Sequence, residues 1–577
     1  MIETAIQKRI DSWLSGPYDP DTKKQIQTLL QSDPQKLIDA FYTTLSFGTG
    51  GLRGIVGIGS NRINFYTIEA ATQGLANYLK QKDENPSVVI GYDSRIHSRA
   101  FAEAAARVLA GNGIVAYLFK ELRPTPLISF ACRHFHASGA IMITASHNPA
   151  EYNGYKVYDA DGGQVLPPDD VGIIEEVNKI SSPNQVKHAP IESNLIKSIG
   201  QEIDRQYLQA CKTLEHFPEQ NKKEGKNLSI VYTSLHGTGI TLIPKILDDW
   251  GFSNVILVEG QCDPDGTFPT VSYPNPEEEK ALSLGIETLE KHNADLLLAT
   301  DPDADRVGVA VRHKNKTHLL NGNQLACILL AHVCRARAQT GRQSSQDAYV
   351  KTIATSELFQ KICDDWKKPC YNTLTGFKYI AGLIKLWEAE EDSPEFVFGA
   401  EESYGYLLGS FARDKDAVVI CSLIAEAALQ AKLEGATLID RLHELYQKHG
   451  IYLETLLSIQ FEETKEGREK MAQKMESWKS SPPKEILGLQ VKTLEDYTLG
   501  VKWDLLAKTQ EPLGLPKTNA LLLWLEDGTK LLIRPSGTEP KVKVYCGIRQ
   551  EKYDSIEEGL KKCKEKAKAI VDRLLLP

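Results

Sequence analysis

The chain has 577 residues, a formal net charge of −9 and an isoelectric point near 5.9. This length exceeds what one hydrophobic core organises, so we expect three to five domains of about 100–200 residues each, and the acidic balance argues against nucleic acid as the main partner. Ten cysteines without any C-x-x-C spacing indicate reduced, mostly buried thiols rather than a disulfide framework or a zinc site.

The first 200 residues alternate between helical and strand-like patterns. A helix is predicted at the start, where charged residues replace the apolar core of a secretory leader. The glycine-rich stretch 47–57 follows, then a strand at 87–95, a helix at about 98–112 and an apolar strand at 141–143. Ser/Pro-rich and Asn/Lys-rich linkers come next, and we place a domain boundary among them near 205.

Two further β/α units follow, at 227–311 and at about 320–445. The repeated strand-then-helix pattern is typical of open, mainly parallel sheets. The longest apolar stretch, 417–431, contains Glu426 and is too short to span a bilayer, so we expect a cytoplasmic protein. From about 451 the pattern changes to α+β, with two strands around a loop and a final basic amphipathic helix.

The predicted fold class is therefore α/β, with three similar mixed-sheet domains and a C-terminal α+β domain. The predicted domains are 1–205, 206–320, 321–450 and 451–577.

The first candidate for chemistry is the serine loop IMITASHNPAEYNGYKVY, residues 141–158. An apolar, β-prone run leads to Ser146, and residues 147–149 prevent the strand from continuing. We therefore expect the serine to be presented by a loop rather than packed. The alternating pattern around Lys156 predicts a second short strand that brings a cation back beside the hydroxyl. This arrangement favours phosphoryl chemistry over an incidental surface turn.

The motif DPDADR follows the apolar run LLLAT and is a candidate metal site. Asp301, Asp303 and Asp305 offer hard oxygen ligands that suit Mg²⁺ and leave positions for water or a phosphate oxygen. An EF-hand would need glycine and glutamate where Arg306 and Arg312 stand, so the pattern does not favour calcium sensing. Three like charges so close together repel one another without a cation.

The motif RPSGTEPK is a candidate phosphate clamp. Arg534 offers a planar fork of donors, while Ser536, Gly537 and Thr538 offer hydroxyls and backbone N–H groups. Taken alone, this short motif is equally compatible with a hairpin turn whose arginine is solvated.

Polar residues follow several of the apolar strands. In the loop GAEESYGY, Glu401 and Ser403 stand at alternate positions and supply acceptors of the kind that sugar hydroxyls require. Ser146, His236, Asp301 and Glu401 all come directly after strand-like runs, which is the ligand-binding carboxyl edge of an open α/β sheet. We therefore expect several domains to face one cleft.

In this order and at these separations, TASHNP with YNGYK, DPDADR, the Glu-x-Ser loop and RPSGTEP resemble the α-D-phosphohexomutase superfamily. The stretches TGGLRG, GYDSR, YTSLHGTG, PDGTFPTVSYPNPEE and LTGFK resemble its longer phosphoglucomutase branch, some of whose members also act on phosphopentoses. The match covers nearly the whole chain. It implies four domains around a central cleft, the fourth being a mobile lid.

The resemblance also implies site residues. The residues expected at the transferring phosphoryl group are Ser146, His147, Lys156, Arg53 and Arg306. Of these, Ser146 is expected to be phosphorylated and Lys156 to be a general acid/base participant. Mg²⁺ is expected on a phosphoserine oxygen of Ser146 and on Asp301, Asp303 and Asp305. The expected substrate contacts are Lys378, Glu401 and Ser403 for the sugar, and Arg534, Ser536, Gly537 and Thr538 for the distal phosphate.

These roles imply a phosphoglucomutase that interconverts α-D-glucose 1-phosphate and glucose 6-phosphate through a phosphoserine enzyme and glucose 1,6-bisphosphate. The family's sugar loop commonly reads Gly-Glu-x-Ser-Gly, whereas here Ala400 precedes Glu401 and Tyr404 follows Ser403, so phosphopentomutase or phosphomannomutase activity stays open.

Two other classes fit less well. A serine hydrolase lacks its G-x-S-x-G elbow here, and a non-catalytic sugar-phosphate sensor would not need the serine, the aspartates and the clamp together. We expect a sugar-phosphate partner, no nucleic acid or membrane, and a monomer or weak homodimer.

Overall fold

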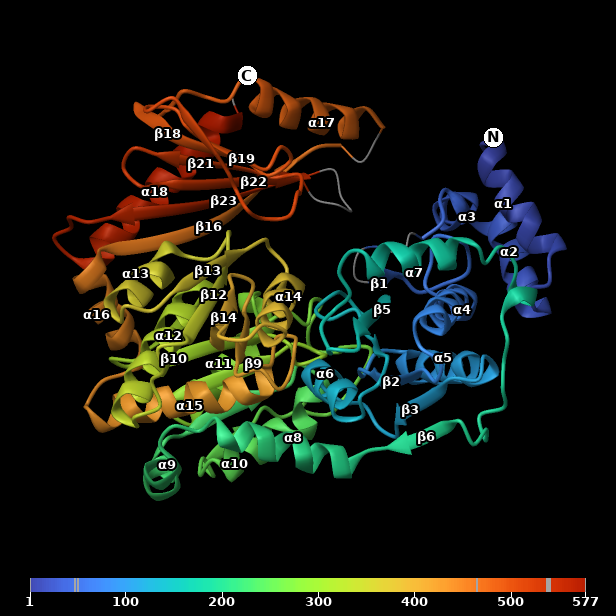
Figure 1. Cartoon of the computed structure of the whole chain (residues 1–577), viewed down its shortest axis with the longest axis horizontal. Helices are drawn as coiled ribbons and strands as arrows, with labels where there is room; N and C mark the ends of the chain where they lie inside the picture. The colour runs from blue at the N-terminus through green and yellow to red at the C-terminus, as the bar shows by residue number, and fades with distance from the viewer. Residues whose placement is uncertain (1, 46–47, 49–50, 463–464, 536–540, 576–577) are drawn as a thin grey trace.

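The structure is a computed structural model that describes residues 2–45, 48, 51–462, 465–535 and 541–575. Within these residues four sheets follow one another along the chain, three of them mixed α/β and the last one β-rich (Figure 1). This arrangement confirms the predicted fold class. The domain boundaries stay predictions; residue 205 lies inside helix α8 (Gln201–Thr213), which Gly200 separates from the last strand of the first sheet.

The first sheet has the strand order β1-β5-β4-β2-β3-β6. Neighbours among β4, β2, β3 and β6 run parallel, and β5 is antiparallel to β1 and β4, so the sheet is parallel only in part. The strand β4, GAIMI, is buried throughout, as its continuous apolar run requires. The strands are β1 (Gly51–Ile55), β2 (Ser87–Tyr92), β3 (Val115–Phe119), β4 (Gly139–Ile143), β5 (Tyr152–Asp159) and β6 (Ile196–Ile199).

The helices before β6 confirm the expected alternation. The predicted helix at 98–112 is α5, which begins at Ser98 and ends at Gly111. The others are α1 (Thr4–Ser15), α2 (Pro20–Ser32), α3 (Pro34–Phe41), α4 (Phe65–Lys82), α6 (Thr125–His134) and α7 (Asp169–Asn178).

The second sheet has the order β11-β10-β9-β7-β8, with β7, β8 and β9 parallel and β10 and β11 antiparallel. The wholly buried strand β9, LLLAT, ends where the DPDADR motif begins. Its strands are β7 (Ile230–Thr233), β8 (Val255–Leu257), β9 (Leu296–Thr300), β10 (Val307–His313) and β11 (Lys316–Leu320). Besides α8, its helices are α9 (Pro218–Glu224), α10 (Ile243–Asp249) and α11 (Ser283–Lys291).

The third sheet has the order β13-β12-β14-β15, parallel except at β15. Helix α12 begins after Asn321, whose side chain forms a reciprocal cap with Gln324. The strands are β12 (Asp347–Thr352), β13 (Cys370–Thr373), β14 (Glu395–Glu401) and β15 (Gly405–Leu408). The helices are α12 (Gly322–Gln339), α13 (Glu357–Asp365), α14 (Phe377–Glu388), α15 (Ala417–Leu433) and α16 (Leu438–His449).

The C-terminal sheet is antiparallel in the order β16-β23-β22-β21-β18-β19-β20, with β17 paired to β18. The predicted pair of strands around RPSGTEPK is β22 and β23, and the predicted final helix is α18. The strands are β16 (Ile451–Gln460), β17 (Glu485–Ile486), β18 (Leu489–Asp496), β19 (Val501–Asp504), β20 (Thr509–Pro512), β21 (Leu521–Leu525), β22 (Lys530–Pro535) and β23 (Lys541–Gln550). The helices are α17 (Lys465–Ser480) and α18 (Ile556–Leu575).

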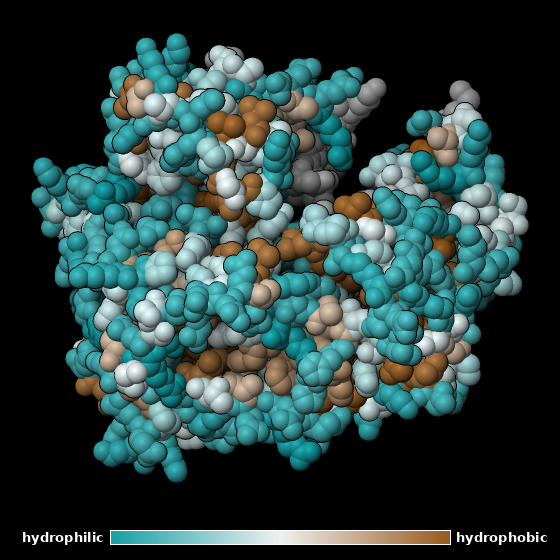
Figure 2. Space-filling view, in the orientation of Figure 1, coloured by the Kyte–Doolittle hydropathy of each residue, from teal (hydrophilic) through white to brown (hydrophobic). Residues whose placement is uncertain are grey.

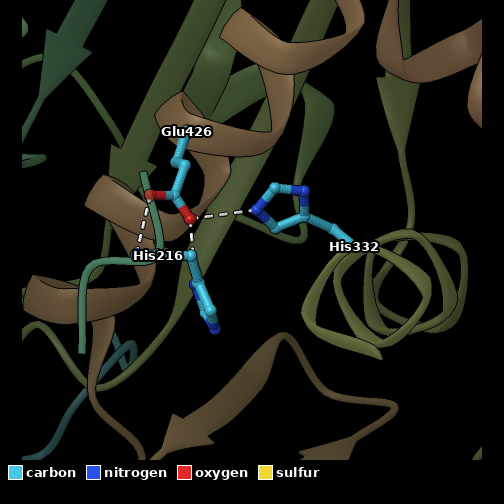
Figure 3. A group of neighbouring side chains, drawn as sticks. All are labelled: His216, His332 and Glu426. Carbon is cyan, nitrogen blue, oxygen red and sulfur yellow. Dashed lines mark hydrogen bonds and ion pairs between the residues drawn. The ribbon is translucent and has the colours of Figure 1, made fainter. Parts of the chain in front are cut away.

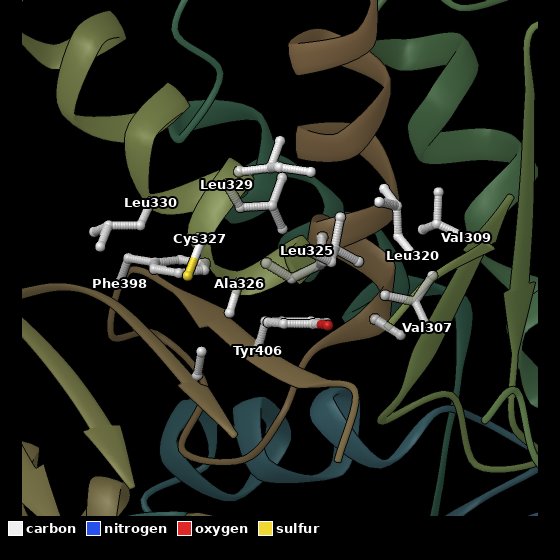
Figure 4. Close-up of a cluster of buried hydrophobic side chains, with 14 of the residues drawn as sticks. Val307, Val309, Leu320, Leu325, Ala326, Cys327, Leu329, Leu330, Phe398 and Tyr406 are labelled. Carbon is white, nitrogen blue, oxygen red and sulfur yellow. The ribbon is translucent and has the colours of Figure 1, made fainter. Parts of the chain in front are cut away.

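Helix α12 joins the second and third domains through a shared core. Figure 4 shows Leu325 and Cys327 of this helix among side chains from β10, such as Val309, and from β14 and β15, such as Phe398 and Tyr406. Burial of such residues contributes about 1.5–3 kcal/mol each. The two domains therefore pack as neighbours with no solvent layer at this helix.

The space-filling view shows a mostly hydrophilic face that is hollowed between the C-terminal domain and the N-terminal helices (Figure 2). Among the helices of the described residues, none combines the length and the apolar character that crossing a bilayer requires.

Candidate active site

A cavity of about 830 Å³ lies where the four domains meet. Its lining includes predicted site residues from each of them, which confirms the expectation of one shared cleft. These residues are Arg53, His147, Arg306, Glu401, Ser403 and Arg534. Ser146, Lys156 and the three aspartates lie buried next to these lining residues rather than on the cavity wall.

Ser146 follows β4 in a left-handed backbone conformation with φ of 51°. Its backbone N–H donates to the Thr144 hydroxyl at 2.8 Å, and its own hydroxyl donates to Asp301 Oδ2 at 2.7 Å. The side chain is not presented to solvent as the sequence suggested: Ser146 is 2% exposed. That expectation is wrong because the DPDADR loop of the second domain packs against the serine.

Arg95 holds the serine loop in place. Its guanidinium donates to the backbone carbonyl of Ser146 at 2.5 Å, to that of Pro149 at 2.7 Å and to that of Asn148. Asp93 pairs with Arg95 at 3.2 Å and accepts from the Thr144 hydroxyl at 2.7 Å. The sequence signal for this pair was the motif GYDSR, which places Asp93 and Arg95 at the end of a strand and was predicted only to resemble the family.

The three aspartates of DPDADR meet at one point, each buried, with carboxylate oxygens within 4.8 Å of one another. Asp301 Oδ1 accepts from the backbone N–H groups of Asp305 and Arg306 at 3.1 and 3.0 Å, which shapes the loop. Oδ1 of Asp303 and Oδ1 of Asp305 are buried and accept no hydrogen bond from the described residues. Orphaned carboxylate oxygens beside a third carboxylate fit a hard divalent cation such as Mg²⁺.

Lysine side chains balance these carboxylates. Lys156 Nζ donates to Asp303 Oδ2 at 2.7 Å and to Asp305 Oδ2 at 3.0 Å, and Lys415 Nζ lies 3.2 Å from Asp305 Oδ2. Burial alone would raise the pKa of Asp305, but these two lysines hold it below the usual range. Burial would lower the pKa of Lys156, but Asp303 and Asp305 raise it, so this lysine stays charged.

The predicted strand that carries Lys156 is β5, which pairs antiparallel with β4 so that Lys156 lies opposite Met142. The sequence pattern thus located this cation correctly. Lys415 was missed, because it precedes α15 in a charged RDKD segment that reads as a solvated loop. It nevertheless lines the cleft.

His147 and the two predicted arginines border Ser146. His147 Nδ1 is 3.2 Å from Ser146 Oγ, and burial followed by the charges of Arg306 and Arg53 holds the pKa of this imidazole well below its usual value. Arg53, on β1, donates to Asn148 Oδ1 at 3.0 Å, and Arg306 pairs with Glu277 at 2.6 Å. Two guanidinium groups therefore lie close to the serine loop, beside an imidazole whose lowered pKa keeps it neutral.

The opposite wall carries the predicted sugar and phosphate loops. Glu401, at the end of β14, accepts from the Gly376 N–H at 2.7 Å, and burial raises its pKa to about 7. Arg534, on β22, donates to the Thr375 hydroxyl. Ser403 lies beside Glu401 on the cavity wall.

Four of the predicted substrate contacts are not among the described residues that line this wall. The predicted clamp residues Ser536, Gly537 and Thr538 lie outside the described residues. Lys378, in the first turn of α14, has its ammonium 5.3 Å from the centre of the Tyr379 ring and is not among the described residues that line this cavity.

Three family models match consecutive parts of the chain. They are described as phosphoglucomutase/phosphomannomutase alpha/beta/alpha domains I, II and III, and they match residues 44–184, 205–315 and 321–449. The chain belongs to the phosphoglucomutase/phosphomannomutase family.

Curated relatives and solved structures agree with this membership. Phosphoglucomutase from Staphylococcus aureus strain MRSA252 is 38% identical over 535 residues, which is 92% of this chain and 94% of the relative. The fold matches a putative phosphomannomutase from Thermus thermophilus with a TM-score of 0.67 and 22% identity, over 92% of this chain and 98% of that one. Parafusin, a phosphoglucomutase of Paramecium, matches in its open form with a TM-score of 0.67 and 17% identity, over 92% of this chain and 95% of that one.

Proposed function

We propose that the chain is a Mg²⁺-dependent phosphoglucomutase that interconverts α-D-glucose 1-phosphate and glucose 6-phosphate. The observation that carries this proposal is the buried contact between the Ser146 hydroxyl and Asp301 at 2.7 Å, directly beside a cleft that Arg53, Arg306 and Arg534 line. Extensive similarity to curated phosphoglucomutases supports the choice of reaction.

Ser146 would act as a phosphoryl carrier. Phosphoserine gives its phosphoryl group to the free hydroxyl of a sugar monophosphate, the serine oxygen leaves and regains a proton, and glucose 1,6-bisphosphate forms. The bisphosphate turns around and returns its other phosphoryl group to Ser146. His147, neutral and with Nδ1 3.2 Å from Ser146 Oγ, would take the serine proton in that return step once the hydroxyl turns from Asp301 to this nitrogen.

The cations would stabilise the charge on the phosphoryl group in transit. Lys156, Arg53 and Arg306 surround the serine loop, and such charge stabilisation supplies most of phosphoryl-transfer catalysis. Mg²⁺, held by Asp301, Asp303, Asp305 and a phosphoserine oxygen, would supply further positive charge at that point.

Substrate binding would use the opposite wall in either orientation of the sugar. Arg534 would bind the phosphate that is not transferred, together with Ser536, Gly537 and Thr538, and Glu401 with Ser403 would accept from sugar hydroxyls. Lys378 would contribute a cation from the first turn of α14. Closure of the C-terminal domain over this phosphate would exclude water, which competes for the phosphoryl group.

The backbone of the sugar loop supports a second candidate substrate. Tyr404 stands between Ser403 and Gly405 with φ of 63°, so the sugar loop has its own backbone shape. Phosphopentomutase or phosphomannomutase activity is the alternative that this loop allows.

The test compares Ser146→Ala with the wild type in an assay of glucose 1-phosphate conversion started with glucose 1,6-bisphosphate. We expect turnover to fall below detection, while Ser181→Ala, on an exposed loop, keeps wild-type turnover. Measuring kcat/KM for glucose, mannose and ribose 1-phosphates then decides the sugar. Near-normal turnover in Ser146→Ala would refute the assignment of the carrier.

A further inference from the structure

Three side chains from distant parts of the sequence converge outside the central cleft. His216 lies between α8 and α9, His332 lies in α12 and Glu426 lies in α15 (Figure 3). Glu426 is fully buried and His216 is 5% exposed, and His332 is largely buried. None of the three lines the cleft described above.

The two imidazoles approach the same oxygen of the carboxylate. His216 Nδ1 is 2.9 Å and His332 Nε2 is 3.1 Å from Glu426 Oε1, and these atoms lie within 4.8 Å of one another (Figure 3). Neighbouring ligand atoms of a four-coordinate zinc ion are separated by roughly 3.3 Å when each is about 2.0–2.1 Å from the metal. The spacing to Oε1 is therefore close to that of a metal site.

The other carboxylate oxygen of Glu426, Oε2, already accepts three hydrogen bonds. Oε2 accepts from the backbone N–H groups of His216 and Phe217, both at 3.0 Å, and from Asn221 Nδ2 at 2.9 Å. If both imidazoles also donate to Oε1, the carboxylate receives five donors, whereas an ionised carboxylate offers about four acceptor positions. A cation between Oε1 and the two ring nitrogens removes this excess, because the imidazoles then contribute lone pairs.

We propose that His216, His332 and Glu426 form a second metal site, which binds a transition-metal ion of the zinc class and ties the second domain to the third. The three donors on Oε2 would hold the carboxylate in its ligating orientation, as outer partners of metal ligands do.

The ligand set selects the kind of ion. Two imidazole nitrogens and one carboxylate suit Zn²⁺, Co²⁺ or Fe²⁺, whereas Mg²⁺ prefers oxygen ligands of the kind found in DPDADR. A small cavity of about 60 Å³ touches His332 and has room for a water molecule as a fourth ligand.

The position of the site indicates a structural role. α9 and α10 belong with the second sheet and pack on α15 of the third domain, and His216 begins the segment that leads into α9. An ion bound only by the folded arrangement stabilises that arrangement by mass action. We therefore expect the ion to raise the melting temperature and to leave the chemistry of the cleft unchanged.

The test uses the full-length chain, stripped of metal and then saturated with Mg²⁺ to fill the acidic triad. Co²⁺ is titrated in as a probe, because nitrogen-containing low-coordinate sites absorb visible light strongly and octahedral all-oxygen sites absorb weakly. We expect one equivalent of strongly absorbing Co²⁺ per chain, displaced by one equivalent of Zn²⁺, with a higher melting temperature in Zn²⁺ than in chelator.

Variants locate the site. Glu426→Gln and His332→Gln should weaken Co²⁺ binding at least tenfold and lose the Zn²⁺-dependent rise in melting temperature. His134→Gln, on the exposed end of α6, should behave as the wild type. If the wild type binds no strongly absorbing Co²⁺, or if Glu426→Gln binds it as tightly as the wild type, the cluster is a hydrogen-bonded network and the proposal is wrong. The wild-type titration decides this even if a variant fails to fold.

Discussion

The cleft triad and the His/Glu cluster are both buried groups of three possible metal ligands, but their charge is balanced differently. Asp301, Asp303 and Asp305 are three carboxylates contacted by lysine ammonium groups. The cluster has one carboxylate, Glu426, surrounded by N–H donors and two imidazoles. The triad therefore offers a hard ion three charged oxygen ligands, whereas the cluster offers one charged oxygen and two imidazole nitrogens.

The two groups are also positioned by different parts of the fold. The triad follows β9 directly, so one strand end and one short loop position all three ligands. The cluster depends on the packing of α12, α15 and the segment before α9. The triad is thus positioned by the edge of one sheet. The second site is positioned by contacts between two domains, so its metal affinity depends on how stably those domains pack together.

The largest expected effect on activity comes from neutralising one ligand of the acidic triad. Asp303→Asn replaces one charged ligand by a neutral one, so we expect Mg²⁺ affinity and kcat/KM each to fall roughly a hundredfold or more. Titration calorimetry with Mg²⁺ and the coupled mutase assay measure this, with the exposed Asp248→Asn as the matched control. Unchanged Mg²⁺ affinity would show that the triad is not the metal site.

Arg534 tests the opposite wall of the cleft. Arg534→Ala removes a charge-assisted contact of about 1.5–3 kcal/mol, so kcat/KM for both glucose 1-phosphate and glucose 6-phosphate should fall roughly ten- to a hundredfold, mainly through KM. The exposed Arg573→Ala, on α18, is the control. A change in sugar preference at normal KM would mean that the phosphate and sugar loops have been assigned the wrong way round.

Lys415 tests the balance of charge at the triad itself. Lys415→Met removes a cation 3.2 Å from Asp305, so Mg²⁺ should bind at least as tightly as in the wild type. Turnover should nevertheless fall about tenfold, because the phosphoryl group in transit loses a stabilising charge. Weaker Mg²⁺ binding together with lower turnover would instead assign Lys415 a role in supporting the metal loop.

The smallest expected effect is on the pH dependence of stability. It concerns Asp416, a buried carboxylate whose hydrogen-bond donors are all neutral. It accepts from the Tyr207 hydroxyl at 2.7 Å and from two backbone N–H groups at the start of α15, and burial raises its pKa to about 6. The folded chain therefore holds this proton more tightly than the unfolded chain. This contribution to stability is complete at low pH and is lost as the pH rises through about 6.

The free energy of unfolding measures this contribution. Between pH 8 and pH 5 the wild type should gain about 1 kcal/mol relative to Asp416→Asn, whose side chain does not titrate. Urea unfolding at the two pH values gives this difference. An equal pH dependence in the two proteins would show that Asp416 stays ionised in the folded chain.

Residues at strand ends were predictable from the sequence because local patterns determine them. Ser146, Asp301 and Glu401 each follow an apolar run, and the alternation around Lys156 located β5. Lys415 could not be assigned in this way, since only the contact of α15 with the second domain brings its ammonium to the triad.

The cluster escaped sequence reasoning for a related reason. Its ligands are separated by about a hundred residues each, and Glu426 was interpreted only as the charge that interrupts an apolar stretch. A search for cysteine spacing finds zinc sites within one loop, whereas this group exists only once α12, α15 and the segment before α9 have packed together. The burial of Ser146 was missed because the second domain, and not its own strand, covers it.

The most direct test of the central claim is whether Ser146 carries the phosphoryl group. Intact-mass spectrometry of the full-length chain should show a gain of one phosphoryl group after incubation with glucose 1,6-bisphosphate, and its loss on addition of excess glucose 6-phosphate. Peptide mapping should place the group on Ser146, and Ser146→Ala should show no gain. Turnover without a phosphorylated enzyme, or a phosphoryl group on another residue that turns over as fast as the reaction, would contradict the account.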